Sequence, residues 1–459
     1  MTKRMDHGLN PAERRATLGL AGVYGTRMLG LFLILPVFAL YAETLPGTTP
    51  LLTGLAIGIY GLTQALLQVP FGLLSDRLGR KPVILVGLTL FALGSVVAAS
   101  AEDILWIVAG RALQGSGAVA AAIMALAADL TREEQRTKIM ATIGMTIGLS
   151  FMLAMIAGPA LDSWVGVPGI FWITTGLALT GMALIAWVVP TPLHSSVHRD
   201  AEPVPTLFRR VLTHADLLRL DLGIFSLHLI LTALFLAVPL LLRDAGVAPA
   251  NHALVYLPIM LIAIAGMVPF VILSEKGGHM KGVFLGAIGT LGTAQLLIWG
   301  FGHQFWPLVL AVALFFVAFN LLEALLPSLV SKTAPPDAKG TAMGVYSTSQ
   351  FTGAFAGGVL GGYLHQHYGV MAPFLLGAGV ALVWLFAASS MCPPRRVASE
   401  LLHLSDTALN DPAGMARQLQ ALPGVVEAVV VPEEGVACLK VDREHFERAR
   451  ADAIIDAPA

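Results

Sequence analysis

The sequence predicts an all-α membrane protein with twelve spanning helices in two related halves, followed by a small α+β domain. Three observations predict this class. Hydrophobic residues make up 56% of the 459-residue chain and charged residues only 12%, about half of the roughly 25% that soluble domains carry. Apolar runs of spanning length recur as far as residue 391, and the composition turns polar after Pro393 and Pro394. So much apolar surface must face lipid.

Each predicted span is close to the roughly 20 residues that cross a bilayer core. We expect these spans to be helices, because a backbone in lipid must satisfy its own hydrogen bonds. The predicted spans are 17–41, 52–74, 82–100, 104–129, 138–161, 168–189, 219–243, 252–273, 281–300, 305–330, 340–364 and 370–391.

Alternate loops carry very different numbers of basic residues. With the N-terminus inside, twenty lysines and arginines fall in cytoplasmic segments, whereas the outer loops contain only Arg243. Basic residues favour the cytoplasmic side, so we predict a multi-pass protein of the bacterial inner membrane with both chain ends in the cytoplasm. The polar, basic stretch from Met1 to Arg15 indicates a retained tail rather than a cleaved signal peptide. The net charge of −1 gives no reason to expect a nucleic-acid partner.

Short motifs of the first half recur in the second half at a nearly constant offset. The motif at 32–36 recurs at 235–239, and Val69-Pro70-Phe71 recurs at 268–270. We therefore expect a six-plus-six repeat with a substrate path between the halves near mid-membrane. The predicted domains are a six-helix bundle over 1–189, a cytoplasmic linker over 190–218, a second six-helix bundle over 219–392 and a cytoplasmic domain over 393–459.

One stretch of the linker has helical periodicity. Leu207, Phe208, Val211 and Leu212 share a helical face, with two arginines opposite. This pattern indicates a short amphipathic helix at the inner leaflet. A solvated linker with chance periodicity is an equal alternative.

The loop between the second and third spans carries the most specific motif. Residues 72–82 read Gly-Leu-Leu-Ser-Asp-Arg-Leu-Gly-Arg-Lys-Pro, which resembles the loop signature of the major facilitator superfamily. The resemblance implies a cytoplasmic gate that is latched in the outward-open state. Ordinary positive-inside charge would explain the basic residues, but not the glycines or the aspartate. The expected gate residues are Gly72, Asp76, Arg77, Gly79, Arg80, Lys81 and Asp129.

Two partners are expected for the acidic gate residues. Asp76 is predicted to approach the N-terminus of the eleventh span near Gly340, where a negative charge is favoured. Asp129 ends the fourth span on the same side and is predicted to pair with Arg77 or Arg80.

Two further motifs resemble those of the superfamily. Arg111 and Gln114 in the fourth span match a motif associated with proton coupling. Gly148 with Gly158-Pro159 in the fifth span resembles the motif of drug/proton antiporters, although Leu161-Asp162 replaces its second glycine pair. Simple close packing of helices explains these small residues nearly as well.

Four ionisable residues within the spans are worth naming: Arg27, Arg111, His228 and Glu323. Such residues are costly in a membrane and are functional candidates by default. An arginine does not release its proton, so the two arginines can bind an anionic or carbonyl group or hold an acid ionised. Glu323 and His228 can carry a proton. The alternative is a buried packing role, which also applies to the uncharged cavity candidates Gln114 and Asn320.

The polar tail predicts a small domain with the order β-α-β-β-α. The pattern predicts strands at 399–405, 425–431 and 436–441, and helices at about 411–422 and 445–454. This order is ferredoxin-like with a short or absent fourth strand. It looks like a heavy-metal-associated domain but lacks the cysteine pair in the first loop, so no metal site is expected.

A superfamily protein with such a tail resembles the YajR group of bacterial transporters, whose C-terminal module is called the YAM domain. The resemblance implies proton-driven export of a small molecule without a cofactor, with the tail regulating the protein or mediating its self-association. A uniporter or importer, and a membrane sensor that signals through the tail, are the alternatives. No ATP-binding motif and no enzyme-like constellation of residues is evident in the sequence.

Overall fold

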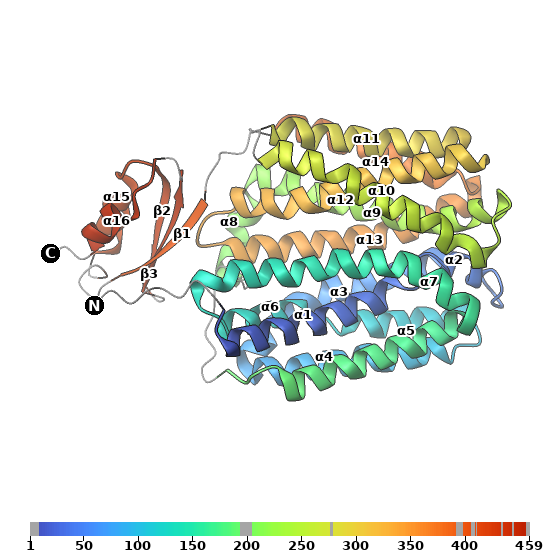
Figure 1. Cartoon of the computed structure of the whole chain (residues 1–459), viewed down its shortest axis with the longest axis horizontal. Helices are drawn as coiled ribbons and strands as arrows, with labels where there is room; N and C mark the ends of the chain where they lie inside the picture. The colour runs from blue at the N-terminus through green and yellow to red at the C-terminus, as the bar shows by residue number, and fades with distance from the viewer. Residues whose placement is uncertain are drawn as a thin grey trace.

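A bundle of long helices carries a small mixed domain at one end (Figure 1). The computed structural model describes residues 9–192, 204–275, 279–391, 398–404, 409, 411–432, 435–442 and 445–455. The chain enters the bundle through α1 and leaves it through α14 at the end that carries the small domain (Figure 1). By the charge distribution, this end is the cytoplasmic one.

The first half of the bundle contains the first six predicted spans, and two of these spans are interrupted. The first span breaks after Phe32, and the fourth breaks between Ser116 and Ala120. The fifth span and most of the sixth span lie in the long helix α7, which bends at Gly166. The φ of Gly166 is 69°, a conformation that glycine adopts readily. The elements are α1 (Pro11–Phe32), α2 (Phe38–Ala42), α3 (Pro50–Leu78), α4 (Arg80–Ala99), α5 (Ile104–Ser116), α6 (Ala120–Asp129), α7 (Glu133–Ala183) and the π-helical turn η1 (Leu184–Val188).

The second half has longer uninterrupted helices, which coincide with the six remaining predicted spans. Its elements are α9 (Ala215–Asp244), the 3-10 turn η3 (Pro249–Asn251), α10 (His252–Glu275), α11 (Met280–Phe301), α12 (Phe305–Thr333), α13 (Lys339–Tyr368) and α14 (Ala372–Ser389). Between the halves, the turn η2 (Pro205–Leu207) leads into α8 (Phe208–Leu212), which buries Val211 and exposes Arg209 and Arg210. Linker residues 193–203 lie outside the described part of the chain.

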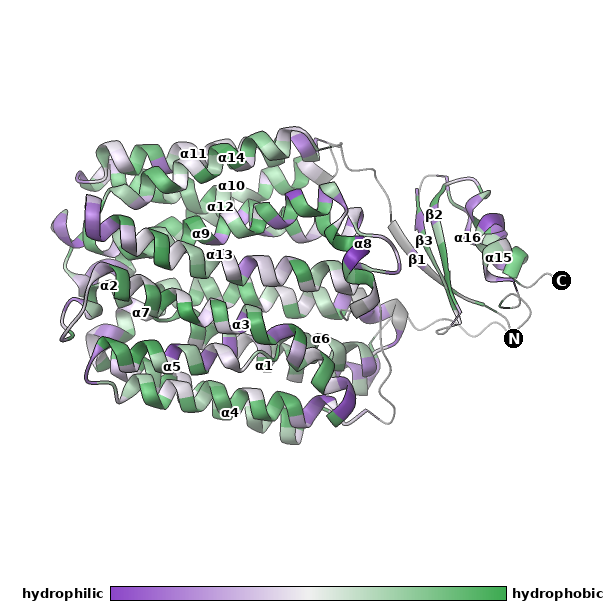
Figure 2. Cartoon of the chain, turned by 180° about the vertical axis from the view of Figure 1, so that it is seen from behind, coloured by the Kyte–Doolittle hydropathy of each residue, from purple (hydrophilic) through white to green (hydrophobic). Residues whose placement is uncertain are grey.

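Hydrophobic residues occupy most of the length of the bundle helices, and hydrophilic residues are more frequent toward the two ends of the bundle (Figure 2). Within the described residues, nine helices are long and apolar enough to cross a membrane, and one of them contains both the fifth and sixth predicted spans. Helices α1 and α13 are not among the nine. Polar and small residues lower their hydropathy because these helices pack mainly against protein rather than lipid.

Helix α13 packs against α3 of the first half and α9 of the second half through glycine. A Cβ atom on Gly54 of α3 would lie 2.0 Å from the carbonyl oxygen of Gly358, and one on Gly357 would lie 2.2 Å from that of Leu229 on α9. Only glycine permits backbones to approach this closely. The contact between Gly54 and Gly358 joins the halves in the outer part of the bundle, and the contact between Gly357 and Leu229 lies within the second half.

The N-terminal end of α1 is fixed by a buried carboxylate. Glu13 forms a capping box with Asn10 and accepts hydrogen bonds from the Arg132 side chain at 2.8 and 2.9 Å. The hydrogen bond from the Arg132 side chain lowers the pKa of the Glu13 carboxyl to about 2. The start of α1 is thereby tied to the segment between α6 and α7.

The small domain has the predicted element order. Strands β1 (Ala398–His403), β2 (Val425–Val431) and β3 (Val436–Val441) form an antiparallel sheet in the order β1-β3-β2. Helices α15 (Pro412–Gln420) and α16 (Arg448–Ile455) cover the face of this sheet that points away from the bundle (Figure 1). Leu402, Leu419, Leu439, Ala451 and Ile455 form its core.

Candidate functional site

Arg27 lies inside the first half rather than between the halves. Its side chain is 1% exposed, and Nη2 donates to the hydroxyl of Tyr60 at 2.7 Å, to Oε1 of Gln64 at 2.6 Å and to the carbonyl oxygen of Gly117 at 3.1 Å. Gly117 stands in the break between α5 and α6. Arg27 therefore binds a carbonyl group within the break, which also accepts a hydrogen bond from the backbone N–H of Val119 at 2.9 Å.

Arg111 forms a second network in the same half. Its Nη1 donates to Oε1 of Gln114 at 2.8 Å, and Nε2 of Gln114 donates to Oγ of Ser95 at 2.7 Å. The ring of Tyr60 lies between the two arginines, with its centroid 5.1 Å from Cζ of Arg111 and 5.9 Å from Cζ of Arg27. Cation–π contacts of this kind favour a desolvated guanidinium. Tyr60 was not among the predicted site residues.

The second half contains a polar cluster from three helices. Gln350 of α13 lies between His228 of α9, 2.8 Å away from Nε2, and Glu323 of α12, 3.4 Å away from Oε1. The Nδ1 atom of His228 lies 3.3 Å from the carbonyl oxygen of Ile224. Both contacts fit a neutral imidazole that donates through Nδ1 and accepts from the Gln350 amide.

Glu323 is the residue of this cluster whose side chain still has an oxygen without a hydrogen-bond partner. Its side chain is 34% exposed, yet the atom Oε2 is buried and has no hydrogen-bond partner. His228 lies 4.0 Å from this oxygen. Asn320, one turn away on α12, makes no side-chain hydrogen bond within the described part of the chain. A carboxyl group with one free oxygen beside a neutral histidine can take up and release a proton.

The predicted gate residues converge on Arg80. Its guanidinium is buried and contacts the carboxylate of Asp76, the hydroxyl of Ser75 at 2.9 Å and the carboxylate of Asp129 at 3.2 Å. Of the two arginines proposed for Asp129, the structure thus places Arg80 beside it. Asp76 also pairs with Arg80 within its own half, whereas Gly340 was the expected partner.

The other gate residues shape this loop. Gly79 has a φ of 92° and separates α3 from α4. A Cβ on Gly72 would lie 3.3 Å from Ala121 of α6, which is a close contact. The amine of Lys81 donates to the carbonyl oxygen of Val189 at the end of the sixth span. Arg77 lies in the last turn of α3.

The small residues of the fifth span behave differently from one another. A Cβ on Gly158 would lie 2.5 Å from the carbonyl oxygen of Leu33, so this glycine allows α7 to approach the end of α1. Pro159 follows inside the helix. Nothing lies within 4 Å of a Cβ on Gly148. In this conformation Gly148 therefore makes no close helix contact with the described residues, and its packing role stays a prediction.

Sequence analysis missed one intramembrane acid. Asp221 is 6% exposed on α9 and falls inside the predicted seventh span. Ionisable residues within a span are functional candidates, and this criterion applies to Asp221 as it does to Glu323. Asp221 lies close to the predicted cytoplasmic end of its span, where a charged residue is expected to belong to the loop.

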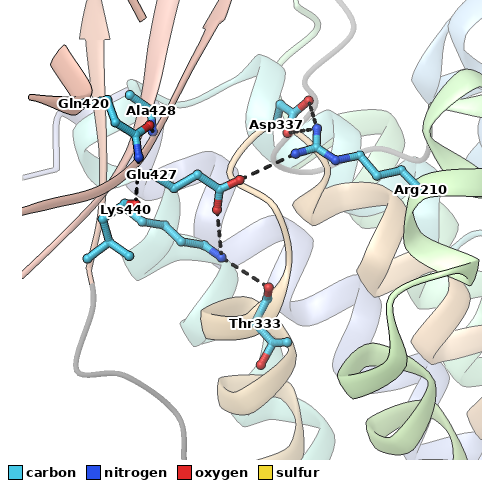
Figure 3. Close-up of polar contacts among 8 residues, drawn as sticks. Arg210, Thr333, Asp337, Gln420, Glu427, Ala428 and Lys440 are labelled. Atoms are coloured by element: carbon cyan, nitrogen blue, oxygen red, sulfur yellow. Dashed lines mark hydrogen bonds and ion pairs between the residues drawn. The ribbon is translucent and has the colours of Figure 1, made fainter. Parts of the chain in front are cut away.

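The small domain contacts the bundle through charged residues (Figure 3). The amine of Lys440 on β3 donates to the carbonyl oxygen of Thr333 at the end of α12 at 3.2 Å and lies 3.6 Å from the carboxylate of Glu427 on β2. Burial lowers the pKa of the Lys440 amine. Glu427 also lies 3.5 Å from Arg210 of α8, which forms two hydrogen bonds with Asp337 at 2.9 and 3.0 Å. These ion pairs connect the tail, the linker and the segment between α12 and α13.

The buried contact between Arg80 and Asp129 yields a stability prediction. Arg80→Ala removes a cation from a fully buried carboxylate, so we expect a loss on the order of 3 kcal/mol. Asp129→Asn in the same chain should restore part of that loss. Thermal unfolding of the purified protein in detergent measures both.

Arg219→Ala is the control, because Arg219 and Asp216 form a partly exposed pair worth less than about 1 kcal/mol. Additive effects of Arg80→Ala and Asp129→Asn would contradict a direct coupling between the two residues.

Comparison with known proteins identifies the family of this chain. The family model of the Major Facilitator Superfamily matches residues 20–357 and 220–403. The chain is 48% identical over 450 residues to the inner membrane transport protein YajR of Escherichia coli (strain K12), covering 98% of this chain and 99% of that protein. It is 22% identical over 344 residues to the multidrug resistance protein MdtH of Proteus mirabilis (strain HI4320), covering 74% of this chain and 84% of that protein.

A solved structure has the same fold. It is a bacterial homologue of the human lysosomal transporter Spinster in an inward-facing and occupied conformation, with a TM-score of 0.67 and 15% identity over 83% of this chain and 98% of that chain. The chain therefore belongs to the Major Facilitator Superfamily of membrane transporters and is a homologue of YajR.

Proposed function

We propose that the protein exports a small molecule from the cytoplasm in exchange for protons, by alternating access across twelve membrane-spanning segments. The observation that carries this proposal is Glu323, a carboxyl group toward the inner part of the tenth span with a buried oxygen that has no hydrogen-bond partner and a partly exposed side chain. An ionisable group in this position is expensive unless it has a function. The name of the relative MdtH, a multidrug resistance protein, favours export.

The outer ends of the halves are in contact, which supports one end state of an alternating-access cycle. Glu43 of the first half pairs with Arg243 of the second half. The backbone N–H of Leu51 donates to Oε1 of Gln366 at 3.3 Å. Deeper in the bundle, the rings of Phe151 and Phe235 meet across the halves at 6.4 Å. We propose that these contacts close the outer side, and that they separate when the protein opens outward.

The proposed cytoplasmic gate would close in the opposite end state, when the outer contacts between the halves have separated. Arg80, Asp76 and Asp129 hold the cytoplasmic ends of α3, α4 and α6 together within the first half. In the outward-open state, we expect this unit to meet the cytoplasmic end of α13 and close the inner side. Gly72 and Gly79 let the helices and the loop come close enough for this contact.

Proton exchange would couple to transport through the Glu323 cluster. Gln350 holds both His228 and Glu323 by hydrogen bonds, so a movement of α13 against α9 and α12 would change the surroundings of the carboxyl group. Such a change alters the proton affinity of Glu323 between the two end states. Arg27 and Arg111 keep fixed charges in the other half and do not carry the proton.

Glu323→Gln should abolish transport driven by a pH gradient while leaving substrate exchange intact. Glutamine has nearly the same shape but does not release a proton at neutral pH. A resistance screen of deletion and overexpression strains would first identify a transported compound. Uptake and counterflow of that compound in proteoliposomes then test the variant.

Glu102→Gln is the control, because Glu102 is exposed on an outer loop. Unchanged pH-driven flux in the Glu323→Gln variant would remove Glu323 from the mechanism. Flux that needs no pH gradient in the unaltered protein would favour a uniporter or importer instead.

The contacts of the tail favour a regulatory role for it. Lys440, Glu427 and Arg210 link the tail to the end of α12 and to the linker between the halves (Figure 3). The tail is thereby tied to elements that would move when the halves rock. A membrane sensor that signals through the tail would use the same contacts, but it would bind its ligand without transporting it.

Breaking these contacts with Glu427→Gln and Lys440→Met should change the rate of counterflow with little change in stability. Lys440 is 8% exposed and Glu427 is 34% exposed, and replacing both partners together leaves no buried charge unpaired. Glu447→Gln is the matched control, because its exposed pair with Arg450 lies within the tail. A lower melting temperature with an unaltered counterflow rate would mean that the tail only stabilises the protein.

A further inference from the structure

Asp221 is a buried acid that the proposed transport cycle does not yet use. It lies on α9 with 6% exposure, and its atom Oδ2 is buried without a hydrogen-bond partner. Within the described ranges, no lysine or arginine forms an ion pair with it. A buried carboxylate without a cation is costly in its ionised form, so Asp221 has a strong tendency to bind a proton.

The hydroxyl group of Tyr346 is also buried and unsatisfied. Tyr346 belongs to α13, is 3% exposed, and has no hydrogen-bond partner for its oxygen. It lies close enough to both Glu323 and Asp221 to interact electrostatically with each carboxyl group. A phenol hydroxyl can accept one proton while it donates another. In this conformation the Tyr346 hydroxyl forms no hydrogen bond with either acid, so a proton can pass between them only when a movement of α13 brings the three groups into contact.

Helix geometry orders these groups along the membrane normal. Asp221 and His228 are seven residues apart on α9, so they share a face and are separated by about 10 Å along the helix axis. Tyr346 and Gln350 are four residues apart on α13 and also share a face. Because α9 starts at Ala215 and α13 at Lys339 on the cytoplasmic side, Asp221 and Tyr346 lie between the Glu323 cluster and the cytoplasm.

The surroundings of Asp221 contain few competing charges. Tyr346 on α13 interacts electrostatically with Asp221 and with Glu323 of α12. Helix α14 contributes the uncharged indole of Trp384, which contacts the backbone at Gly223. Nearer the start of α9, Asp216 and Arg219 pair with each other at 2.6 Å.

Cations on this side include Lys332 in the last turn of α12, Lys339 at the start of α13 and the two arginines of the linker helix. In α8, Arg209 is exposed and Arg210 is engaged with Asp337. Burial is therefore the main influence on Asp221, and Tyr346 is a neighbour that interacts with it.

We propose that Asp221 is a second proton-binding carboxyl group, which exchanges protons between Glu323 and the cytoplasm through the hydroxyl of Tyr346. This inference rests on the proposed role of Glu323 as the proton carrier. In the inward direction, the O–H bond of protonated Glu323 breaks and its proton passes to the Tyr346 oxygen. The original phenol proton passes to the Asp221 carboxylate, and Asp221 then releases a proton to cytoplasmic water. Tyr346 ends with one proton, as it began, and no electrons are transferred.

Infrared difference spectroscopy tests this relay without knowledge of the substrate. The full-length protein in lipid nanodiscs is titrated between alkaline and acidic pH, and the absorption of protonated carboxyl groups is followed. We expect one such band to disappear in Glu323→Gln and another in Asp221→Asn. Asp216→Asn is the control, because its carboxyl group is partly exposed and pairs with Arg219.

The rate of proton exchange separates a relay from a static buried acid. After a rapid pH jump, the Glu323 band should respond at least about tenfold more slowly in Asp221→Asn and in Tyr346→Phe than in the unaltered protein. An unchanged rate in both variants would overturn the relay while leaving Glu323 as a proton carrier. If Glu323→Gln leaves every carboxyl band in place, the proposed function itself fails, whatever Asp221 does.

Discussion

The close packing of α13 against α3 and α9 is the constraint on which the rest of the architecture depends. Gly357 and Gly358 are adjacent in sequence, yet one meets the backbone of Leu229 and the other that of Gly54. One helix thus holds both halves together along its outer portion, at distances that no side chain would permit. Gln350 lies on the same helix and donates a hydrogen bond to Glu323. A change in the packing of α13 would therefore alter the position of Gln350 relative to Glu323 and His228.

The two halves use their buried charges in different ways. In the first half, Arg27 and Arg111 donate to side-chain oxygens and to carbonyl groups of the same half. These contacts hold the interrupted fourth span, α5 and α6, against the neighbouring helices of the first half. In the second half, Glu323 and Asp221 keep an oxygen without a partner. Groups that lack a fixed partner are the ones that can gain or lose a proton as their surroundings change.

Much of the fold could be predicted from the sequence because lipid imposes strong rules. Span length, loop charge and the turn signals of the tail gave the helix order and the β-α-β-β-α domain. The helix breaks could not be predicted, because the break near Gly117 depends on Arg27, which is 90 residues away in the chain. Close approach of α13 also depends on which glycines face each other, and a single sequence does not contain this information.

The sequence predicted most residues of the candidate site, but it did not predict which side chains pair with one another. The cost of burying charge selected Arg27, Arg111, His228 and Glu323, and the motif selected Arg80. The choice of Arg80 over Arg77 for Asp129 depends on which side chain points inward at the end of α3 and the start of α4. Asp221 was missed because hydropathy locates span ends only to within a few residues.

The central claim is that the outer contact between the halves opens and closes. Spin labels at Thr44→Cys and Ala248→Cys report the separation of the outer ends, in a chain with Cys392 and Cys438 replaced by alanine. Pulsed dipolar spectroscopy in nanodiscs should find a short and a long separation, and Gly54→Trp should remove the short one. A single separation that Gly54→Trp leaves unchanged would contradict the account.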